Sequence, residues 1–180
     1  MTIDQNLKLM TLREEDAEAL FQVVDANRAH LREWLPWLDV NTEVKHTREF
    51  IRSALKQETD NLGPTFAVIL DDRISGVVGY HPIRWNNKSV EIGYWLSRDV
   101  VGQGIMTRCC RALVDHAFEG IGLNRVTIPA AVGNCKSRAV PERLGFKKEG
   151  VIRDAEWLYD HYVDHVLYAV LKREWKGESG

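Results

Sequence analysis

The sequence has little that would direct it to a membrane or hold it together by disulfides. None of its apolar runs reaches the roughly eighteen residues of a membrane span, and its first six residues lack the basic stretch and apolar core of a signal peptide. Only three cysteines occur, an odd number without zinc-type spacing, at Cys109, Cys110 and Cys135. These absences favour a chain that stays in a reducing cytoplasm.

The chain also lacks an excess of charge of one sign. It has 24 Lys and Arg against 26 Asp and Glu, a formal net charge of -2, so no net field attracts nucleic acid or an anionic membrane. We therefore expect no direct nucleic-acid partner and no membrane partner. The length of 180 residues fits one domain, 1–180, whose polar tail, 172–180, we expect to fray.

Hydrophobic patterning predicts helices that flank one mixed sheet, an α/β or α+β fold. A strand over 7–12 precedes a helix with apolar positions from Ala19, and Pro36 interrupts the next segment. Thr42 is the expected N-cap of a second helix, which ends near Asn61. Further strands are predicted at 65–70, 74–80, 89–96, 125–132, 146–151 and 162–171, and further helices at 105–118 and 134–144.

A glycine pair separates the strand that ends at Leu96 from the helix that begins at Ile105. Gly102 and Gly104 there can leave several backbone N–H groups directed at one point, where the helix dipole favours a phosphate. The loop has neither the Lys-Ser or Lys-Thr of a Walker loop nor a third glycine at dinucleotide spacing. A tight turn that requires positive φ is the alternative, and the spacing alone does not choose between them.

Three sequence blocks give this loop a context. They are Glu91–Leu96 (EIGYWL), Gly102–Thr107 (GQGIMT), and Asn134–Arg138 (NCKSR) followed by Arg143–Phe146 (RLGF). In this order they resemble the GNAT superfamily of acetyl-CoA-dependent N-acetyltransferases. The likeness is greatest to the bacterial enzymes that acetylate the N-terminal amine of ribosomal proteins, and it extends from about residue 7 to Leu171, including Trp34–Trp37 and Glu156-Trp157.

The resemblance implies a GNAT-type, mostly antiparallel sheet of about seven strands, splayed around the acetyl-CoA site. Pantetheine would pair with the backbone of Glu91–Leu96, and the pyrophosphate would bind the amides of Val101 to Met106 without a metal. The implied acetyl-CoA contacts are Tyr94, Trp95, Leu96, Val101, Gly102, Gln103, Gly104, Ile105, Met106, Asn134 and Ser137. Asp99 stands where the family often has Gln or Arg, and we expect it to point away, with Arg98 and Arg108 offsetting its charge.

The resemblance also implies the catalytic residues. Many family members use a tyrosine as the acid at the position that Pro141 occupies here, so the usual acid is missing. The ribosomal-protein subgroup implies Ser137 as the group that protonates or hydrogen-bonds the CoA sulfur, and Glu156 as the base. The alternatives are that Ser137 satisfies local backbone groups, that Glu156 is a solvated loop carboxylate, and that Asn134 is an N-cap.

Five aromatic residues are candidates for a groove that takes the end of a peptide substrate: Trp34, Trp37, Trp85, Trp157 and Tyr159. Core or dimer packing is the alternative for each. An acetyl-cysteine route through Cys109 or Cys110 is disfavoured, because cysteine on a core helix is usually inert. His161 and His165 have the spacing of a helical metal pair but lie in a predicted strand, so we expect no metal site.

The function implied is transfer of an acetyl group from the co-substrate acetyl-CoA to a primary amine, by direct attack in a ternary complex. The favoured acceptor is the N-terminal α-amine of a ribosomal or other protein, and Asp154 and Asp160 make the region near Glu156 acidic, which suits a cationic amine. A polyamine or an antibiotic amine, a non-catalytic CoA-binding module and a nucleotide-binding domain remain alternatives. A homodimer or higher oligomer is expected from the subgroup resemblance.

Overall fold

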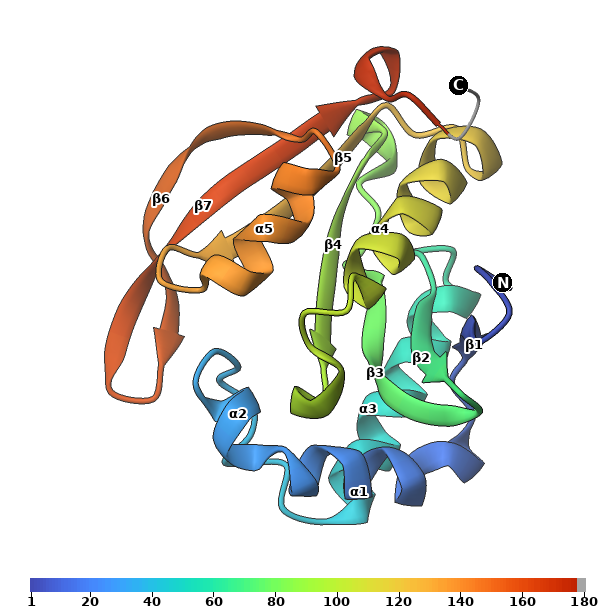
Figure 1. Cartoon of the computed structure of the whole chain (residues 1–180), viewed down its shortest axis with the longest axis vertical. Helices are drawn as coiled ribbons and strands as arrows, with labels where there is room; N and C mark the ends of the chain where they lie inside the picture. The colour runs from blue at the N-terminus through green and yellow to red at the C-terminus, as the bar shows by residue number, and fades with distance from the viewer. Residues whose placement is uncertain (178–180) are drawn as a thin grey trace.

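The computed structural model describes residues 1–177 and contains one seven-stranded sheet with helices on both faces (Figure 1). The strands are β1 Leu7–Thr11, β2 Thr65–Leu70, β3 Arg73–Tyr80, β4 Ser89–Leu96, β5 Arg125–Ala131, β6 Lys147–Leu158 and β7 His161–Leu171. The α-helices are α1 Ala17–Ala26, α2 Arg28–Arg32, α3 Val44–Thr59, α4 Ile105–Asp115 and α5 Cys135–Arg143. These elements confirm the predicted mixed fold and most of the predicted strand positions.

The strand order is β1-β2-β3-β4-β5-β7-β6, and each neighbouring pair is antiparallel except β4 and β5. These two parallel strands pair over three residues only, from Ser89 with Arg125 to Glu91 with Thr127. Beyond that point β4 continues along β3 and β5 continues along β7, so the sheet opens between β4 and β5 (Figure 1).

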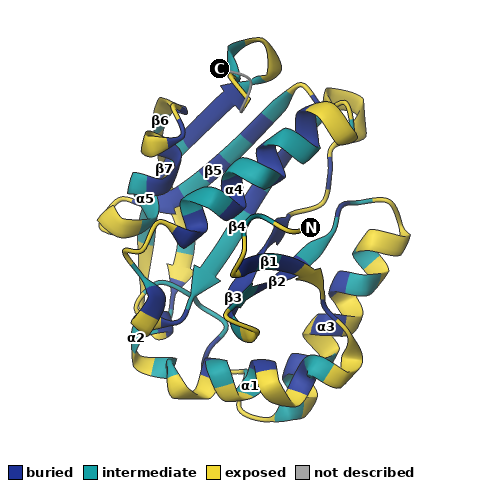
Figure 2. Cartoon of the chain, turned by 45° about the vertical axis from the view of Figure 1, so that its right-hand side comes forward, coloured by how far each residue is buried: buried dark blue, intermediate teal, exposed yellow. Residues whose placement is uncertain are grey.

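Helices cover the sheet on both faces because the central strands bury side chains in both directions. Val68 and Val78 face a cluster that includes Leu113 of α4, whereas Ala67 and Val77 pack with Ile51 of α3. Successive side chains of a strand alternate between faces, so near-continuous apolar runs such as 66–68 are expected in strands covered twice. Figure 2 shows this as dark central strands under helices with exposed outer faces.

Two boundaries differ from the prediction. Helix α3 begins at Val44, with Glu43 rather than Thr42 at its N-cap, and Nδ1 of His46 accepts hydrogen bonds from the amides of both residues. Strand β6 runs to Leu158 instead of ending at Val151. The extension was missed because it is interrupted by an irregularity around Asp154, whose φ is +47°, and its charged residues do not alternate with apolar ones.

The expected frayed tail is also corrected in part. Residues 172–174 form a 3-10 turn, and Trp175 packs edge-on against Phe118 and Phe146 while its Nε1 donates to Asp115 at 2.6 Å. One aromatic anchor is enough to hold a polar segment against the core. Residues 178–180 of the predicted tail lie outside the described residues.

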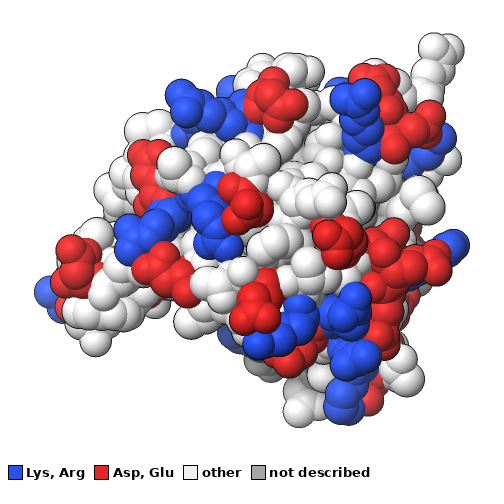
Figure 3. All heavy atoms as spheres, turned by 90° about the horizontal axis from the view of Figure 1, so that it is seen from below, with Lys and Arg blue, Asp and Glu red and all other residues white. Residues whose placement is uncertain are grey.

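The surface agrees with the near-neutral charge of the chain. On the face seen from below in Figure 3, acidic and basic side chains are intermixed. Over residues 1–177, we find no helix with the length and apolar character that crossing a bilayer requires.

Candidate active site

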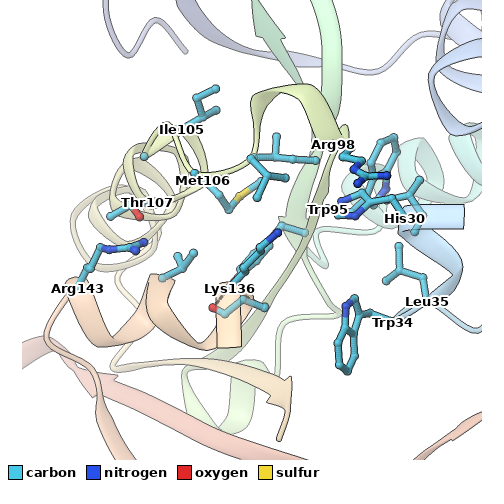
Figure 4. Close-up of a pocket in the computed structure, with 18 residues that line it drawn as sticks. His30, Trp34, Leu35, Trp95, Arg98, Ile105, Met106, Thr107, Lys136 and Arg143 are labelled. Atoms are coloured by element: carbon cyan, nitrogen blue, oxygen red, sulfur yellow. Dashed lines mark hydrogen bonds between the residues drawn. The ribbon is translucent and has the colours of Figure 1, made fainter. Parts of the chain in front are cut away.

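A cavity of about 350 Å³ lies where β4 and β5 separate. Its walls are the end of β4, the glycine loop, the first turns of α4 and α5, and the segment from α2 to Leu35 (Figure 4). The β4 backbone here has its β3 partner on one edge, while pairing with β5 has already ended at Glu91. A strand edge of this kind can pair with an extended ligand as an added strand would.

The glycine loop is open toward solvent and ends at a helix N-terminus. Gly102 and Gly104 have φ of +88° and +72°, and a Cβ built on either would meet no atom within 4 Å. The tight-turn alternative is confirmed, because both glycines adopt positive φ, and the same conformation leaves the backbone open to a ligand. Helix α4 starts directly after Gly104, so its first amides have no helical acceptors. This arrangement suits a pyrophosphate.

Three cationic side chains line the same cavity. Arg98 comes from the turn after β4, and Lys136 and Arg143 come from α5 (Figure 4). Sequence analysis missed Lys136 and Arg143, although their spacing of seven residues, two helical turns, was a usable signal. Asp99 is exposed and is absent from the described cavity lining, in line with the expectation. Arg108 does not offset it, because Arg108 pairs with Asp4.

Nine of the eleven predicted acetyl-CoA contacts line the cavity. The nine are Tyr94, Trp95, Leu96, Val101, Gly102, Gly104, Ile105, Met106 and Ser137. The two others differ. The side-chain amide of Gln103 donates to the carbonyl of Asp99 at 3.2 Å, and Oδ1 of Asn134 accepts from the amide of Ser137 at 3.0 Å. The N-cap alternative therefore describes the Asn134 side chain.

Ser137 lies in the first turn of α5, facing Tyr94 of β4 across the cavity wall. The Tyr94 hydroxyl donates to the Ser137 carbonyl oxygen at 3.0 Å, and the Ser137 Oγ donates to the Tyr94 oxygen at 3.2 Å. Burial raises the pKa of Tyr94 far above its ordinary value of 10, so its hydroxyl remains protonated. Ser137 thus combines a cavity-lining position with fixed local hydrogen bonds.

Glu156 is in strand β6, so the alternative of a solvated loop carboxylate is wrong. It pairs with Val163 of β7, and its Oε2 lies 3.5 Å from Nε2 of His165. The two side chains are 34% and 18% exposed, respectively, so both are partly withdrawn from water. Glu156 is not part of the cavity lining described for residues 1–177, and sequence reasoning did not anticipate its histidine neighbour.

Of the five predicted groove aromatics, only Trp34 lines the cavity. Trp37 packs against Trp95 with ring centroids 6.4 Å apart, and Tyr159 donates to the carbonyl of Leu35, the residue after Trp34. Trp157 is half exposed beside Tyr162 on the last two strands.

The structure corrects the expectation for Trp85. Its Nε1 donates to the carbonyl of Asn61 at 2.7 Å, beside the first residue of β4, whereas the cavity lies at the other end of that strand.

The structure gives the cysteines and histidines that the sequence disfavours as catalytic or metal-binding residues ordinary packing or pairing roles. Cys109 and Cys110 are fully buried in α4, and burial raises the pKa of Cys109 to about 12, which disfavours the thiolate that nucleophilic attack requires. His161 pairs with Asp160 and His165 with Glu156. Within the described part of the chain, no three His, Cys, Asp or Glu side chains are grouped as a metal site.

The site fits an acetylated pantetheine carrier. It combines an unpaired strand edge, an open helix N-terminus and three cations, which match the amides, pyrophosphate and charge of coenzyme A. The family model of the GNAT acetyltransferase domain matches residues 6–147.

Two curated relatives are similar along nearly their whole length. A putative ribosomal N-acetyltransferase, YdaF, of Bacillus subtilis (strain 168) is 38% identical over 98% of this chain and 97% of its own. A ribosomal-protein-serine acetyltransferase of Escherichia coli (strain K12) is 31% identical over 93% of each. The structure of RimL, a ribosomal L7/L12 α-N-protein acetyltransferase in complex with coenzyme A, superposes with a TM-score of 0.91 at 30% identity, covering 94% of this chain and 96% of that one.

The chain therefore belongs to the GNAT acetyltransferase family. It is an N-acetyltransferase that uses acetyl-CoA as its co-substrate.

Proposed function

We propose that this enzyme acetylates the N-terminal α-amine of a protein, most specifically of a ribosomal protein, by direct attack in a ternary complex. The observation that carries the proposal is the end-to-end likeness to two relatives named for ribosomal acetylation, one of which, from Escherichia coli, is named for serine on a ribosomal protein. The cavity supports it. Coenzyme A would occupy the glycine-loop side of the cavity, which leaves the side bounded by the α2 segment, Trp34 and Leu35 for the acceptor.

In the proposed mechanism, acetyl-CoA supplies a thioester whose carbonyl carbon the neutral amine attacks. The C–N bond forms as the C–S bond breaks, and the Ser137 hydroxyl turns its proton from the Tyr94 oxygen to the CoA thiolate, which accepts the hydrogen bond. The proton that the amine loses passes to Glu156, through water because the carboxylate does not line the cavity. The CoA thiolate then takes a proton from solvent and the protonated Glu156 carboxyl returns one to solvent, so the protons balance.

Replacing the two proposed catalytic residues tests these roles. We expect Ser137→Ala and Glu156→Gln each to lower kcat by about 10²-fold or more, the usual contribution of a general acid, a general base or one transition-state donor. The dissociation constant of acetyl-CoA, measured by calorimetry, should change by less than about threefold, because the strand edge and glycine loop remain.

Ser53→Ala and Glu58→Gln, both on the exposed surface of α3, are matched controls and should retain wild-type kcat. Unchanged turnover in Ser137→Ala and Glu156→Gln would remove both assignments. Loss of acetyl-CoA binding in Ser137→Ala would show that this residue holds the co-substrate instead of assisting its departure.

A further inference from the structure

Tyr94 connects β4 to α5 at the point where β4 is no longer paired with β5. Pairing between β4 and β5 ends at Glu91 with Thr127, and three residues later Tyr94 pairs only with Val78 of β3. From there its side chain reaches α5, which follows β5 in the chain. The two hydrogen bonds between Tyr94 and Ser137 therefore bridge the opened part of the sheet.

The carbonyl that Tyr94 contacts has lost its normal helical partner. In an α-helix the carbonyl of residue 137 accepts from the amide of residue 141. Residue 141 is a proline inside α5, and proline has no N–H to donate. The phenol of Tyr94 supplies a donor to the Ser137 carbonyl in its place, at 3.0 Å. Ser137 is partly buried, and a carbonyl left without a donor there would cost free energy, so the tyrosine and the proline are structurally linked.

The backbone of Ser137 is consequently held on both sides, because its amide donates to Asn134 and its carbonyl accepts from Tyr94. Its Oγ donates to the Tyr94 oxygen when no CoA sulfur is present, and rotation about the Cα–Cβ bond can redirect that proton. The hydroxyl of Tyr94 does not itself ionise, because burial raises the pKa of that group. Tyr94 therefore acts on the geometry of Ser137 and is not a source of protons.

We propose that Tyr94 is a positioning residue, whose hydroxyl replaces the helical donor missing at Pro141 and so fixes Ser137 beside the CoA sulfur. The inference rests on the proposed role of Ser137. Loss of the hydroxyl would release the first turn of α5, and a displacement of about 1 Å is enough to lower a rate by as much as 10²-fold.

The decisive variants are Tyr94→Phe and its combination with Pro141→Ala. Tyr94→Phe keeps the ring and should lower kcat at least about tenfold, with the acetyl-CoA dissociation constant within about threefold of wild type. Pro141→Ala restores an N–H for the Ser137 carbonyl, so the double variant should recover most of the lost kcat. Tyr80→Phe is the matched control, because it removes a tyrosine hydroxyl that donates to a carbonyl of α4 instead.

A mutant cycle separates this inference from the role of Ser137. If Tyr94 acts through Ser137, Tyr94→Phe should cause no further loss of kcat in a Ser137→Ala background. If the losses of kcat in the two single variants multiply in the double variant, or if Tyr94→Phe alone keeps wild-type kcat, the positioning role of Tyr94 is overturned. The catalytic role of Ser137 would then be unaffected. Wild-type kcat in Ser137→Ala would overturn both.

Hydrogen–deuterium exchange gives a readout that needs no acceptor. Amides of 137–140 should exchange faster in Tyr94→Phe than in wild type, return toward wild type when Pro141→Ala is added, and remain unchanged in Tyr80→Phe. Unchanged exchange in Tyr94→Phe would contradict the inference even if the natural acceptor differs from the one proposed.

Discussion

At the scale of single residues, two tyrosine hydroxyls contact different parts of the fold. Tyr94 and Tyr80 lie on neighbouring strands, and each donates to a helix carbonyl. Tyr94 meets the first turn of α5 inside the cavity, whereas Tyr80 meets Leu113 and also lies 3.2 Å from Nδ1 of His116. The first contact belongs to the proposed catalytic site, and the second lies in the core.

His116 should make stability depend on pH. Burial lowers its pKa below the ordinary value of 6.5, so the folded state disfavours the charged imidazole. As the pH falls below 6.5 the unfolded chain takes up the proton first, and the free energy of unfolding should decrease until the pH is below the folded-state pKa. Urea unfolding between pH 7.5 and 5 measures this. His116→Gln should show a smaller decrease, and an equal decrease would exclude His116 as its source.

The sequence predicts residues whose backbone conformation is special, such as loop glycines. It does not predict which side chains from distant segments come into contact. Gly102 and Gly104 were identified because a strand-to-helix turn has few other solutions. Lys136 and Arg143 became visible only when α5 was placed beside the loop, and the contact of Glu156 with His165 depends on the register of β6 with β7. The expectation for Trp85 is wrong because an aromatic residue in a turn does not reveal which end of the following strand carries the cavity.

At the scale of elements, we expect the loop between β4 and α4 to contribute strongly to the affinity for acetyl-CoA, because its amides face the cavity. Gly104→Ala places a side chain at a φ of +72° and should cost about 1–2 kcal/mol in backbone strain. Because relief of that strain moves amides at the start of α4, we expect the acetyl-CoA dissociation constant to rise about tenfold, measured by calorimetry.

Gly145→Ala is the matched control for this loop. Gly145 follows α5 with a φ of +77° and equally open space, but it does not line the cavity. Gly145→Ala should lower the melting temperature about as much as Gly104→Ala does, but it should leave the acetyl-CoA dissociation constant unchanged. Equal weakening of binding in both variants would mean that general destabilisation, not the loop, controls affinity.

Element boundaries were predictable where composition changes sharply. The hairpin of β2 and β3 follows from two apolar runs separated by Asp71 and Asp72, which adopt positive φ in the turn. The end of β6 was not predictable, because an irregular strand on the edge of a sheet retains charged, exposed residues. The packing of Trp175 could not be predicted, because its partners lie far away in the sequence. They are in α4, in the π-helix that continues α4, and in the segment before β6.

At the scale of the whole molecule, the opening between β4 and β5 creates the space that the cavity occupies. One half of the sheet, β1 to β4, provides the free strand edge and leads into the glycine loop. The other half, β5 to β7, contains Glu156 in β6 and is connected to Ser137 through α5, which follows β5. The two halves are joined by the three residue pairs between β4 and β5 and by contacts such as Tyr94 with Ser137. Oligomeric assembly stays a prediction, and a particle of 20.6 kDa in light scattering would contradict it.

The most direct test of the central claim is calorimetric titration with acetyl-CoA, followed in the same buffer by thiol release with N-terminal peptides of ribosomal proteins, spermidine and an aminoglycoside. We predict binding of acetyl-CoA and thiol release that depends on a peptide with a free α-amine, with the same peptide inactive when its amine is blocked. Release only with spermidine or the aminoglycoside would contradict the protein acceptor, and absence of acetyl-CoA binding would contradict the assignment of the cavity itself.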